Sequence, residues 1–583
     1  MRVGGCTDSP KPTDRPTSCQ REATKSWRRA NLTHTPEAHT HTHSNKERAS
    51  RTSIHNGSVK MCMTMLFRSR FLFLLAVAAL LAVLSLSLQF SSTRREVRMR
   101  PAGDRRTRER RVGNPRWKAQ EKPKSRNGPR AVHLIPVATS KGDGMVAKIR
   151  KQISANVYTT PPSLDPIYEA YLYCNLPNNT DHGMEGHAPP DYKLLSVHVM
   201  IRHGDRYPLY AIPKTKAPAI DCTLIPGREP SHRLLKDFIK TRNNAAKGQL
   251  DSPLNNIALL PSHTVCEMGE LTQTGVVQHL LNGEHLHGKY IRNHRLLPDN
   301  WTMKQLYVES TGKSRTLESG LALLYSLLPR FDWGKIRVRH QWSTIFCSNS
   351  CDCPMRNHYL EEEQRRQYNL RVKNNELERT YIEMAKIVGV PTRQLRAANP
   401  IDSLLCHFCH NVSFPCTEQG CIKLEHFRAI KAHQLEDEQD RQRKKLYYKY
   451  ALLATHPILN QTVTRMQRIT QGMKDEIFAL YSAHDVTVAP MLSALGITHA
   501  SFPRFGARLI FEIWQNGKDK KKNFVRILYN GDDVTSQTSF CSGLKAHSKR
   551  LCRFENFLNF VRKDVFAVFN STNYYDACHR RVF

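Results

Sequence analysis

The chain has 583 residues, a formal net charge of +37 and a hydrophobic content of 40%. Much of the positive charge lies in residues 91–130, which hold fifteen Lys or Arg against four Asp or Glu. Much of the charge therefore lies outside the part of the chain that shows strand and helix patterns.

Residues 1–64 are polar and lack helical or strand periodicity, so we expect a disordered or non-native N-terminal extension. Their alternating His-Thr tract at 39–43 could bind metal, as His-rich tracts do. A CA dinucleotide repeat read in frame encodes the same alternation, and we prefer that interpretation. We therefore expect translated leader sequence, with the functional start at one of three methionines: Met61, Met63 or Met65.

Residues 71–90 form the most apolar stretch, about twenty residues without a charge, which is long enough to span a bilayer as a helix. A cleaved signal peptide is the alternative, but the run exceeds a typical signal core and no small-x-small site follows closely. Basic residues flank both sides, so the positive-inside rule does not decide the orientation. We expect an uncleaved anchor in a single-pass type II protein of the secretory pathway, with residues 65–70 cytosolic and the chain beyond the anchor lumenal.

Residues 91–169 are predicted to be a basic, proline-containing stem or linker without stable structure. One interpretation is a solvated spacer. A compatible one is a tether attracted to polyanions such as glycosaminoglycans or membrane headgroups. In a lumenal protein we do not expect a nucleic-acid partner.

Cysteines are dense beyond the anchor, which suits an oxidising compartment. They are Cys174, Cys222, Cys266, Cys347, Cys351, Cys353, Cys406, Cys409, Cys416, Cys421, Cys541, Cys552 and Cys578. Their number is odd, so at least one is free or pairs with another chain. The run from Cys406 through Cys409 to His410 resembles a zinc knuckle, but no second spaced ligand pair is evident and we favour disulfides.

Asparagine sequons agree with lumenal export, although they also occur by chance. The candidate glycosylation sites are Asn178, Asn300, Asn411, Asn460 and Asn570.

Strand and helix patterns alternate along the rest of the chain. Apolar runs predict three buried strands, at 194–201, 306–310 and 475–482. An apolar helical face follows Arg315, made by Leu317, Leu321, Leu323, Leu324 and Leu327. Residues 507–514 and 524–529 predict a hairpin across Asn516-Gly517. We expect an α/β fold with a mostly parallel sheet covered on both faces, whose ligands bind at the carboxyl ends of the strands.

Seven residues directly follow the first predicted strand: Arg202-His203-Gly204-Asp205-Arg206-Tyr207-Pro208. Two arginines thus flank a histidine where a strand becomes a loop. Guanidinium forks suit phosphate oxygens, and a histidine between them is positioned to attack phosphorus. The heptad fits the R-H-G-x-R-x-P signature of the histidine acid phosphatases, and the sequence resembles that family from about residue 170 onward.

Three later pieces resemble the same family. Ala483-His484-Asp485, at the end of the third strand, matches its His-Asp pair. Residues 312–316 resemble the segment that supplies one more phosphate-binding arginine, here Arg315. Residues 266–275 resemble a G-x-L-T-x-x-G stretch that opens a helix near the site.

The resemblance implies a two-step phosphomonoesterase mechanism that needs no metal or other cofactor. His203 would be the nucleophile and form a phosphoramidate that water later cleaves. Asp485 would protonate the leaving oxygen and then activate that water. The phosphate would be bound by Arg202, Arg206, Arg315 and His484. We interpret His198, inside the strand, as structural, and assign Thr487 no role.

The implied fold is a phosphoglycerate-mutase-like, doubly wound α/β sheet with an inserted smaller helical cap, behind the anchor and stem. Residues 340–450 are charged, helical in pattern and rich in cysteine, and would form the cap. Residues 170–339 and 451–583 would form the α/β core. The mutase branch shares this fold, but the Gly204-Asp205-Arg206 spacing and the His-Asp pair favour the phosphatase branch.

The order of tail, anchor, basic stem and heptad resembles that of Golgi members of the family. This implies a phosphorylated glycan or glycopeptide substrate, namely 2-phosphoxylose in the linkage region between glycosaminoglycan and protein. A glycosyltransferase partner is compatible with that role. One alternative is a broad-range acid or inositol-polyphosphate phosphatase. Another is a catalytically inert Golgi scaffold that binds glycans, which would have a broken catalytic set, whereas every expected residue is present here.

Overall fold

The structure is a computed structural model that describes residues 165–177, 183–187, 189–248, 266–340, 344–347, 351–542 and 551–580. The predicted N-terminal extension, cytosolic tail and membrane anchor lie outside the described residues, as does the predicted stem up to residue 164. Within the described ranges, no helix has both the length and the apolar character needed to cross a membrane.

A central β-sheet organises the described chain, with strands in the order β10-β8-β7-β1-β6-β2-β3 and with β9 paired to β8. Its parallel half consists of β1 (Tyr192–Arg202), β6 (Phe478–Ala483), β2 (Leu306–Ser310) and β3 (Arg339–His340). The three strands predicted from apolar runs are therefore confirmed, although β6 begins at Phe478 and not at residue 475.

The other half of the sheet is antiparallel. It consists of β7 (Arg508–Asn516), β8 (Asn523–Tyr529), β9 (Asp532–Asp533) and β10 (Cys552–Arg553). The predicted hairpin is β7 and β8, and its short connection can join only antiparallel strands. Since β7 also lies antiparallel to β1, the sheet is mixed and the expectation of a mostly parallel sheet is wrong for this half.

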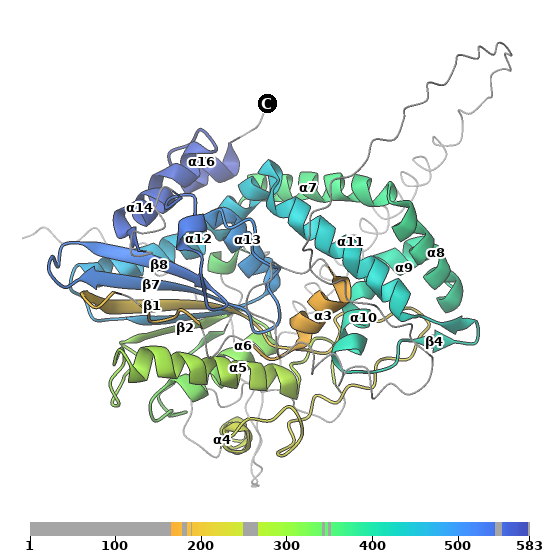
Figure 1. The fold of residues 1–583 in the computed structure, drawn as a ribbon, viewed down its shortest axis with the longest axis horizontal. Coiled ribbons are helices and arrows are strands. Elements are labelled where there is room, and N and C mark those ends of the chain that lie inside the picture. The colour runs from red at the N-terminus through yellow and green to blue at the C-terminus, as the bar shows by residue number, and fades with distance from the viewer. Residues whose placement is uncertain are drawn as a thin grey trace, which may run out of the picture. The chain divides into compact units, whose positions relative to one another are not determined.

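Both faces of the sheet are covered, as expected. Val197, Val199 and Ile201 of β1 pack in one apolar cluster with α5 (Gln273–Leu286) and α6 (Ser314–Leu327). Met200 points to the other face and packs with α12 (Lys445–Thr470) and α13 (Asp485–Leu495). Figure 1 shows α4 (Leu235–Ala246), α5 and α6 on one side, and α12, α13, α14 (Phe554–Asn559) and α16 (Tyr574–His579) on the other.

The helix predicted after Arg315 is α6, and all five leucines of its predicted apolar face are buried. It begins only a few residues after β2 ends, so its N-terminus lies near the carboxyl end of that strand. The same arrangement recurs at β6, because α13 starts two residues after Ala483.

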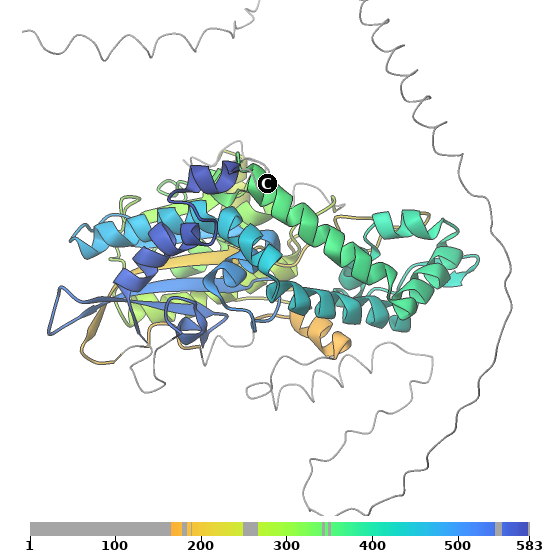
Figure 2. The ribbon, with the colours of Figure 1, turned by 90° about the horizontal axis from the view of Figure 1, so that it is seen from above.

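A mainly helical segment separates the two parts of the sheet in the sequence. It contains α7 (Pro354–Val372), α8 (Asn375–Val388), α9 (Thr392–Ala397), α10 (Pro400–Cys409) and α11 (Leu424–Gln442), with a small hairpin of β4 (Cys416–Thr417) and β5 (Gly420–Cys421). Figures 1 and 2 show α8 to α11 beside the sheet and not on either face. The early helix α3 (Pro166–Cys174) shares an apolar cluster with α8, α10 and α11.

Disulfides join most of the cysteines of the described chain. The pairs are Cys174–Cys409, Cys222–Cys266, Cys347–Cys351, Cys353–Cys578, Cys416–Cys421 and Cys541–Cys552. Cys406 is a buried free thiol, which accounts for the odd number. Because Cys409 is bonded to Cys174, the zinc-knuckle alternative is wrong and the preferred disulfide interpretation is confirmed for Cys409.

Candidate active site

The site residues predicted from sequence lie at the carboxyl ends of three neighbouring parallel strands. Arg202 ends β1, His484 and Asp485 follow β6, and Arg315 lies just after β2. In such sheets, ligands bind outside these strand ends. The N-termini of α6 and α13 open at the same edge and favour a negatively charged ligand.

Arg202 is held rigidly at the centre of the site, with no exposed surface. Its Nη2 lies 2.9 Å from Asp485 Oδ2, and its Nη1 donates a hydrogen bond to the Pro503 carbonyl at 2.7 Å. Its guanidinium also lies 4.8 Å from the ring centre of Tyr173 and 4.5 Å from that of Phe505. Stacking on aromatic rings orients a guanidinium while leaving part of its edge for a ligand.

His203 is buried, and one of its ring nitrogens is fixed by the backbone. Its Nδ1 lies 2.7 Å from the Gly204 carbonyl oxygen, which can only accept, so Nδ1 carries the proton. Burial, together with the charges of Arg315 and Arg202, holds the pKa of His203 well below its ordinary value. The imidazole is therefore neutral, and its Nε2 keeps the lone pair that a nucleophile needs.

Glycines allow the heptad to pack directly against the start of α5. A Cβ on Gly204 would lie 2.4 Å from the Gly275 carbonyl oxygen, which no side chain could tolerate. Thr272 caps α5 by accepting a hydrogen bond from the Gly275 N–H. The prediction that residues 266–275 lead into a helix near the site is thus confirmed.

His484 and Arg315 complete the group that the sequence pattern singled out. The ring centres of His203 and His484 are 5.4 Å apart, and His484 Nε2 lies 2.8 Å from the Thr311 hydroxyl. Burial and the charge of Arg315 lower the pKa of His484 to about 3. Burial and the charge of Arg206 lower the pKa of Arg315 to about 10, which still leaves it charged at neutral pH.

Three guanidinium donors at the site have no hydrogen-bond acceptor among the described residues. They are the Nε atoms of Arg202, Arg206 and Arg315, and all three are buried. Buried donors are normally bonded, and leaving one unsatisfied costs about 1–3 kcal/mol. Unsatisfied cationic donors at the carboxyl ends of the strands suit a phosphate dianion.

Arg206, like Arg202, has a carboxylate partner in the structure. Asp402 of α10 accepts from Arg206 Nη2 at 2.7 Å and from Nη1 at 3.5 Å, and it also accepts from the Leu209 N–H. Sequence reasoning missed Asp402, because no local pattern relates it to a heptad nearly 200 residues earlier. It missed the stacking partners Tyr173 and Phe505 for the same reason.

Asp205, the first of the two variable positions of the heptad signature, also binds the helical segment. It is buried, accepts a hydrogen bond from the Thr272 hydroxyl, and lies 2.7 Å from His410 Nε2. His410 ends α10 and is adjacent to the disulfide-bonded Cys409. The helical segment therefore contacts the heptad through Asp402 and His410, and Cys406 Sγ lies 3.5 Å from the Arg206 carbonyl oxygen.

The His410–Asp205 ion pair should make stability depend on pH. Burial lowers the pKa of His410, but the Asp205 carboxylate outweighs it, and the net shift is upward. The stabilisation is therefore complete below the ordinary histidine pKa of about 6.5 and is lost as the pH rises through the raised value. The melting temperature of the native protein should fall more steeply above about pH 6.5 than that of His410→Gln. If the melting temperatures of the two proteins fell equally with rising pH, this prediction would be wrong.

The sequence also singles out a strand histidine, a threonine and five sequon asparagines, and the structure describes all of them except Asn178. His198 is buried within β1, where burial and the charge of Arg465 lower its pKa to about 3, and it is structural. Thr487 is buried in the first turn of α13. Asn178 lies outside the described residues, whereas the other sequon asparagines are exposed: Asn300, Asn411, Asn460 and Asn570.

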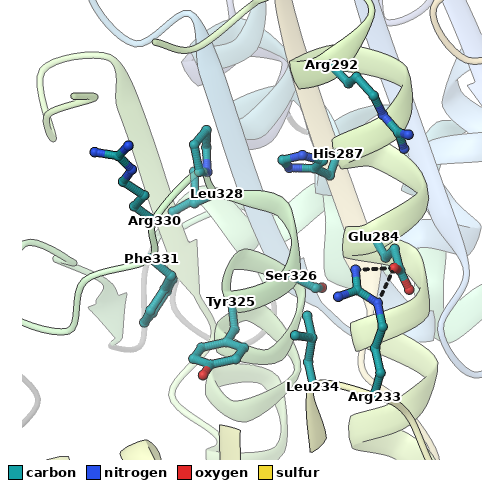
Figure 3. Close-up of a pocket in the computed structure, with 11 residues that line it drawn as sticks. Arg233, Leu234, Glu284, His287, Arg292, Tyr325, Ser326, Leu328, Arg330 and Phe331 are labelled. Atoms are coloured by element: carbon teal, nitrogen blue, oxygen red, sulfur yellow. Dashed lines mark hydrogen bonds and ion pairs between the residues drawn. The ribbon is translucent and has the colours of Figure 1, made fainter. Parts of the chain in front are cut away.

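A separate pocket of about 340 Å³ lies at the other ends of α5 and α6 (Figure 3). Arg233 lies on its wall, and its Nε donates to Glu284 at 2.7 Å. Tyr325 and Leu328 lie at the C-terminus of α6, where the helix dipole disfavours anions. This pocket contains none of the residues that converge at the strand ends, so we do not assign the chemistry to it.

Known proteins similar to this chain agree with the resemblance seen in its motifs. Residues 193–530 match the histidine phosphatase superfamily (branch 2). The chain is 62% identical over 524 residues to 2-phosphoxylose phosphatase 1 of Xenopus tropicalis, covering 89% of this chain and 100% of that protein. It is 58% identical over 522 residues to 2-phosphoxylose phosphatase 1 of Homo sapiens, with the same coverage.

Among solved structures, the apo multiple inositol polyphosphate phosphatase of Bifidobacterium longum is similar, with a TM-score of 0.42 and 13% identity. The matched region covers 68% of this chain and 98% of the Bifidobacterium longum chain. A likeness at this level carries no information about function. The family match and the two relatives decide the assignment. The chain belongs to the histidine phosphatase superfamily, branch 2.

Proposed function

We propose that the chain is a phosphomonoesterase that forms a phosphohistidine intermediate and removes phosphate from 2-phosphoxylose in the linkage region between glycosaminoglycan and protein. The observation that supports this chemistry is the state of His203. Its imidazole is neutral with a free Nε2, and it lies beside three arginines that have unsatisfied donors. The substrate is supported by relatives named 2-phosphoxylose phosphatase 1, which this chain matches over their full length.

In the first step the phosphate dianion binds between the guanidinium groups of Arg202, Arg206 and Arg315. These groups neutralise the charge that otherwise repels a nucleophile. His484 adds a hydrogen bond to a phosphate oxygen. His203 Nε2 then attacks phosphorus, the N–P bond forms, and the P–O bond to the sugar breaks.

Asp485 protonates the departing sugar oxygen. Burial raises the pKa of Asp485, but the charges of Arg202 and Arg206 lower it more, so without substrate the carboxyl is ionised. A bound phosphate brings negative charge that offsets these cations, so the pKa of Asp485 rises when substrate binds. The carboxylate therefore takes up a proton from solvent as substrate binds and holds it when the alkoxide needs it. It returns a proton to solvent when phosphate leaves.

In the second step water attacks the phosphohistidine. The Asp485 carboxylate, now ionised, takes a proton from that water. The P–N bond breaks, inorganic phosphate leaves, and His203 returns to its neutral form. The two steps balance without any further reactant.

The finer features of the prediction belong to the same proposal. The segment from α7 to α11 serves as a helical cap, which is supported by its contacts to the heptad through Asp402 and His410. Residues 71–90 anchor the protein in the Golgi membrane, with the catalytic domain in the lumen. The disulfides and the exposed sequon asparagines support that location. A protease-protection experiment on intact microsomes tests this location. Digestion of the catalytic domain by the added protease would contradict it.

The proposed function is tested with the full-length protein in detergent on three substrates: a synthetic 2-phosphoxylose linkage glycopeptide, inositol hexakisphosphate and an aryl phosphate. We expect kcat/KM for the glycopeptide to exceed that for inositol hexakisphosphate by about 100-fold or more. Similar values for all three would identify a broad-range phosphatase. Binding of the glycopeptide without phosphate release from any substrate would identify an inert scaffold.

A further inference from the structure

Three large apolar side chains border the candidate active site and are exposed. Tyr210 is 47% exposed, Met268 is 70% exposed and Val486 is 63% exposed. Single exposed apolar residues are common on protein surfaces and need no explanation. These three differ because Tyr210 follows the heptad, Val486 follows Asp485, and Met268 lies on a loop that packs against Arg315.

Tyr210 and Met268 lie on two chain segments that run side by side. The Tyr207 N–H donates to the Glu270 carbonyl at 2.8 Å, and the Gly269 N–H donates to the Pro208 carbonyl at 3.2 Å. An antiparallel bridge joins residues 206 and 271 in the same stretch. The two segments therefore lie side by side at the heptad. Tyr210 lies on one of them and Met268 on the other.

This pair of segments lies directly against a predicted phosphate ligand. Gly269 has a φ of +80°, and a Cβ there would lie 2.7 Å from Leu209 Cδ2 and 3.0 Å from Arg315 Nη1. Only glycine lets the loop approach so closely. Gly269 therefore lies against both Leu209 and Arg315. Met268 is the residue before Gly269, and Tyr210 is the residue after Leu209.

Val486 borders the site at Asp485. Its own N–H donates to Asp485 Oδ1 at 2.8 Å in the first turn of α13. The Asp485 carboxylate faces the leaving oxygen, so the first turn of α13, which carries Val486, lies on the leaving-group side of the site.

We propose that Tyr210, Met268 and Val486 form an apolar rim that binds the uncharged saccharide leaving group of the substrate, with the C–H faces of its rings packed on these side chains. The proposal rests on the proposed function and adds to it a basis for choosing substrates. Its support is the continuity of the rim with the phosphate-binding residues. Apolar walls beside a few fixed polar groups are the usual composition of a small-molecule site. Uncharged side chains also give no compensation for the further phosphates of an inositol polyphosphate.

The test compares Tyr210→Ala and Met268→Ala with wild type, using the full-length protein in detergent. The substrates are the 2-phosphoxylose glycopeptide and methyl phosphate, which also releases an alkoxide but has no ring to pack on the rim. For Tyr210→Ala we expect kcat/KM on the glycopeptide to fall about tenfold, mainly through KM, as for the loss of one buried aromatic contact. Activity on methyl phosphate should stay within about twofold.

Tyr575→Ala is the matched control, because Tyr575 is a tyrosine of similar prominence, 71% exposed on α16. It should leave both substrates unchanged. The rim is refuted if neither rim variant affects the glycopeptide, or if methyl phosphate activity falls as much as glycopeptide activity. Failure of the proposed function looks different: wild type would then hydrolyse methyl phosphate but not the glycopeptide.

Discussion

Replacing His203 by alanine is expected to lower phosphate release from every substrate by at least about 10⁴-fold, because the variant has no atom to form the covalent intermediate. The backbone around it is held by contacts that do not involve the imidazole, such as the hydrogen bond from the Gly204 N–H to Ser319 at 3.1 Å. The fold should therefore persist, and the loss should appear in kcat.

The intermediate itself can be trapped. Phosphoramidates survive base and break down in acid, so a reaction with radiolabelled substrate quenched into base should label wild type and not His203→Asn. Asparagine retains an N–H that can donate to the Gly204 carbonyl but has no nucleophilic ring nitrogen. His579→Ala, at an exposed histidine of α16, is the control and should be labelled like wild type. Labelled His203→Asn would rule out this nucleophile.

Asp485→Asn should lower kcat for the sugar phosphate by about 10²- to 10⁴-fold, the usual contribution of general acid–base catalysis. The asparagine cannot donate a carboxylic proton to an alkoxide. An aryl phosphate releases a phenolate, which leaves without full protonation, so its first step should suffer much less. The ratio of the two losses therefore isolates the proton transfer from any change in phosphate binding.

The substitution also removes the charge partner of the fully buried Arg202, whose Nη2 lies 2.9 Å from Asp485. Uncompensated buried charge is destabilising, so melting temperatures must accompany the kinetics. If Asp485→Asn slowed formation of the phosphohistidine equally for both substrates while remaining folded, Asp485 would act in that step by holding Arg202 and not by donating a proton.

The parts of the site predictable from sequence share one property, which is that they are local. The heptad, His484-Asp485 and the Arg315 segment each follow a strand whose apolar run is recognisable on its own. Parallel strands bring their carboxyl ends to one edge, so recognising three strand ends was enough to place these residues together. The leucine face of α6 was predictable for the same reason.

The missed features all depend on contacts between distant parts of the chain. Asp402 and His410 reach the heptad from α10, and Tyr173 reaches Arg202 from α3. No spacing rule links such positions. The antiparallel half of the sheet was underestimated because a hairpin pattern fixes the pairing of β7 with β8 but does not show that β7 also pairs with β1. The partner of Cys409 could not be deduced from the order of the cysteines.

The Cys174–Cys409 bridge joins the two helices that hold the site arginines in place. Tyr173, beside one cysteine, stacks on Arg202; Asp402, on the helix of the other, binds Arg206. A newly made chain with reduced thiols lacks this covalent link between the supports of its phosphate-binding groups. Oxidative maturation therefore fixes the spacing of these two supports as well as stabilising the fold.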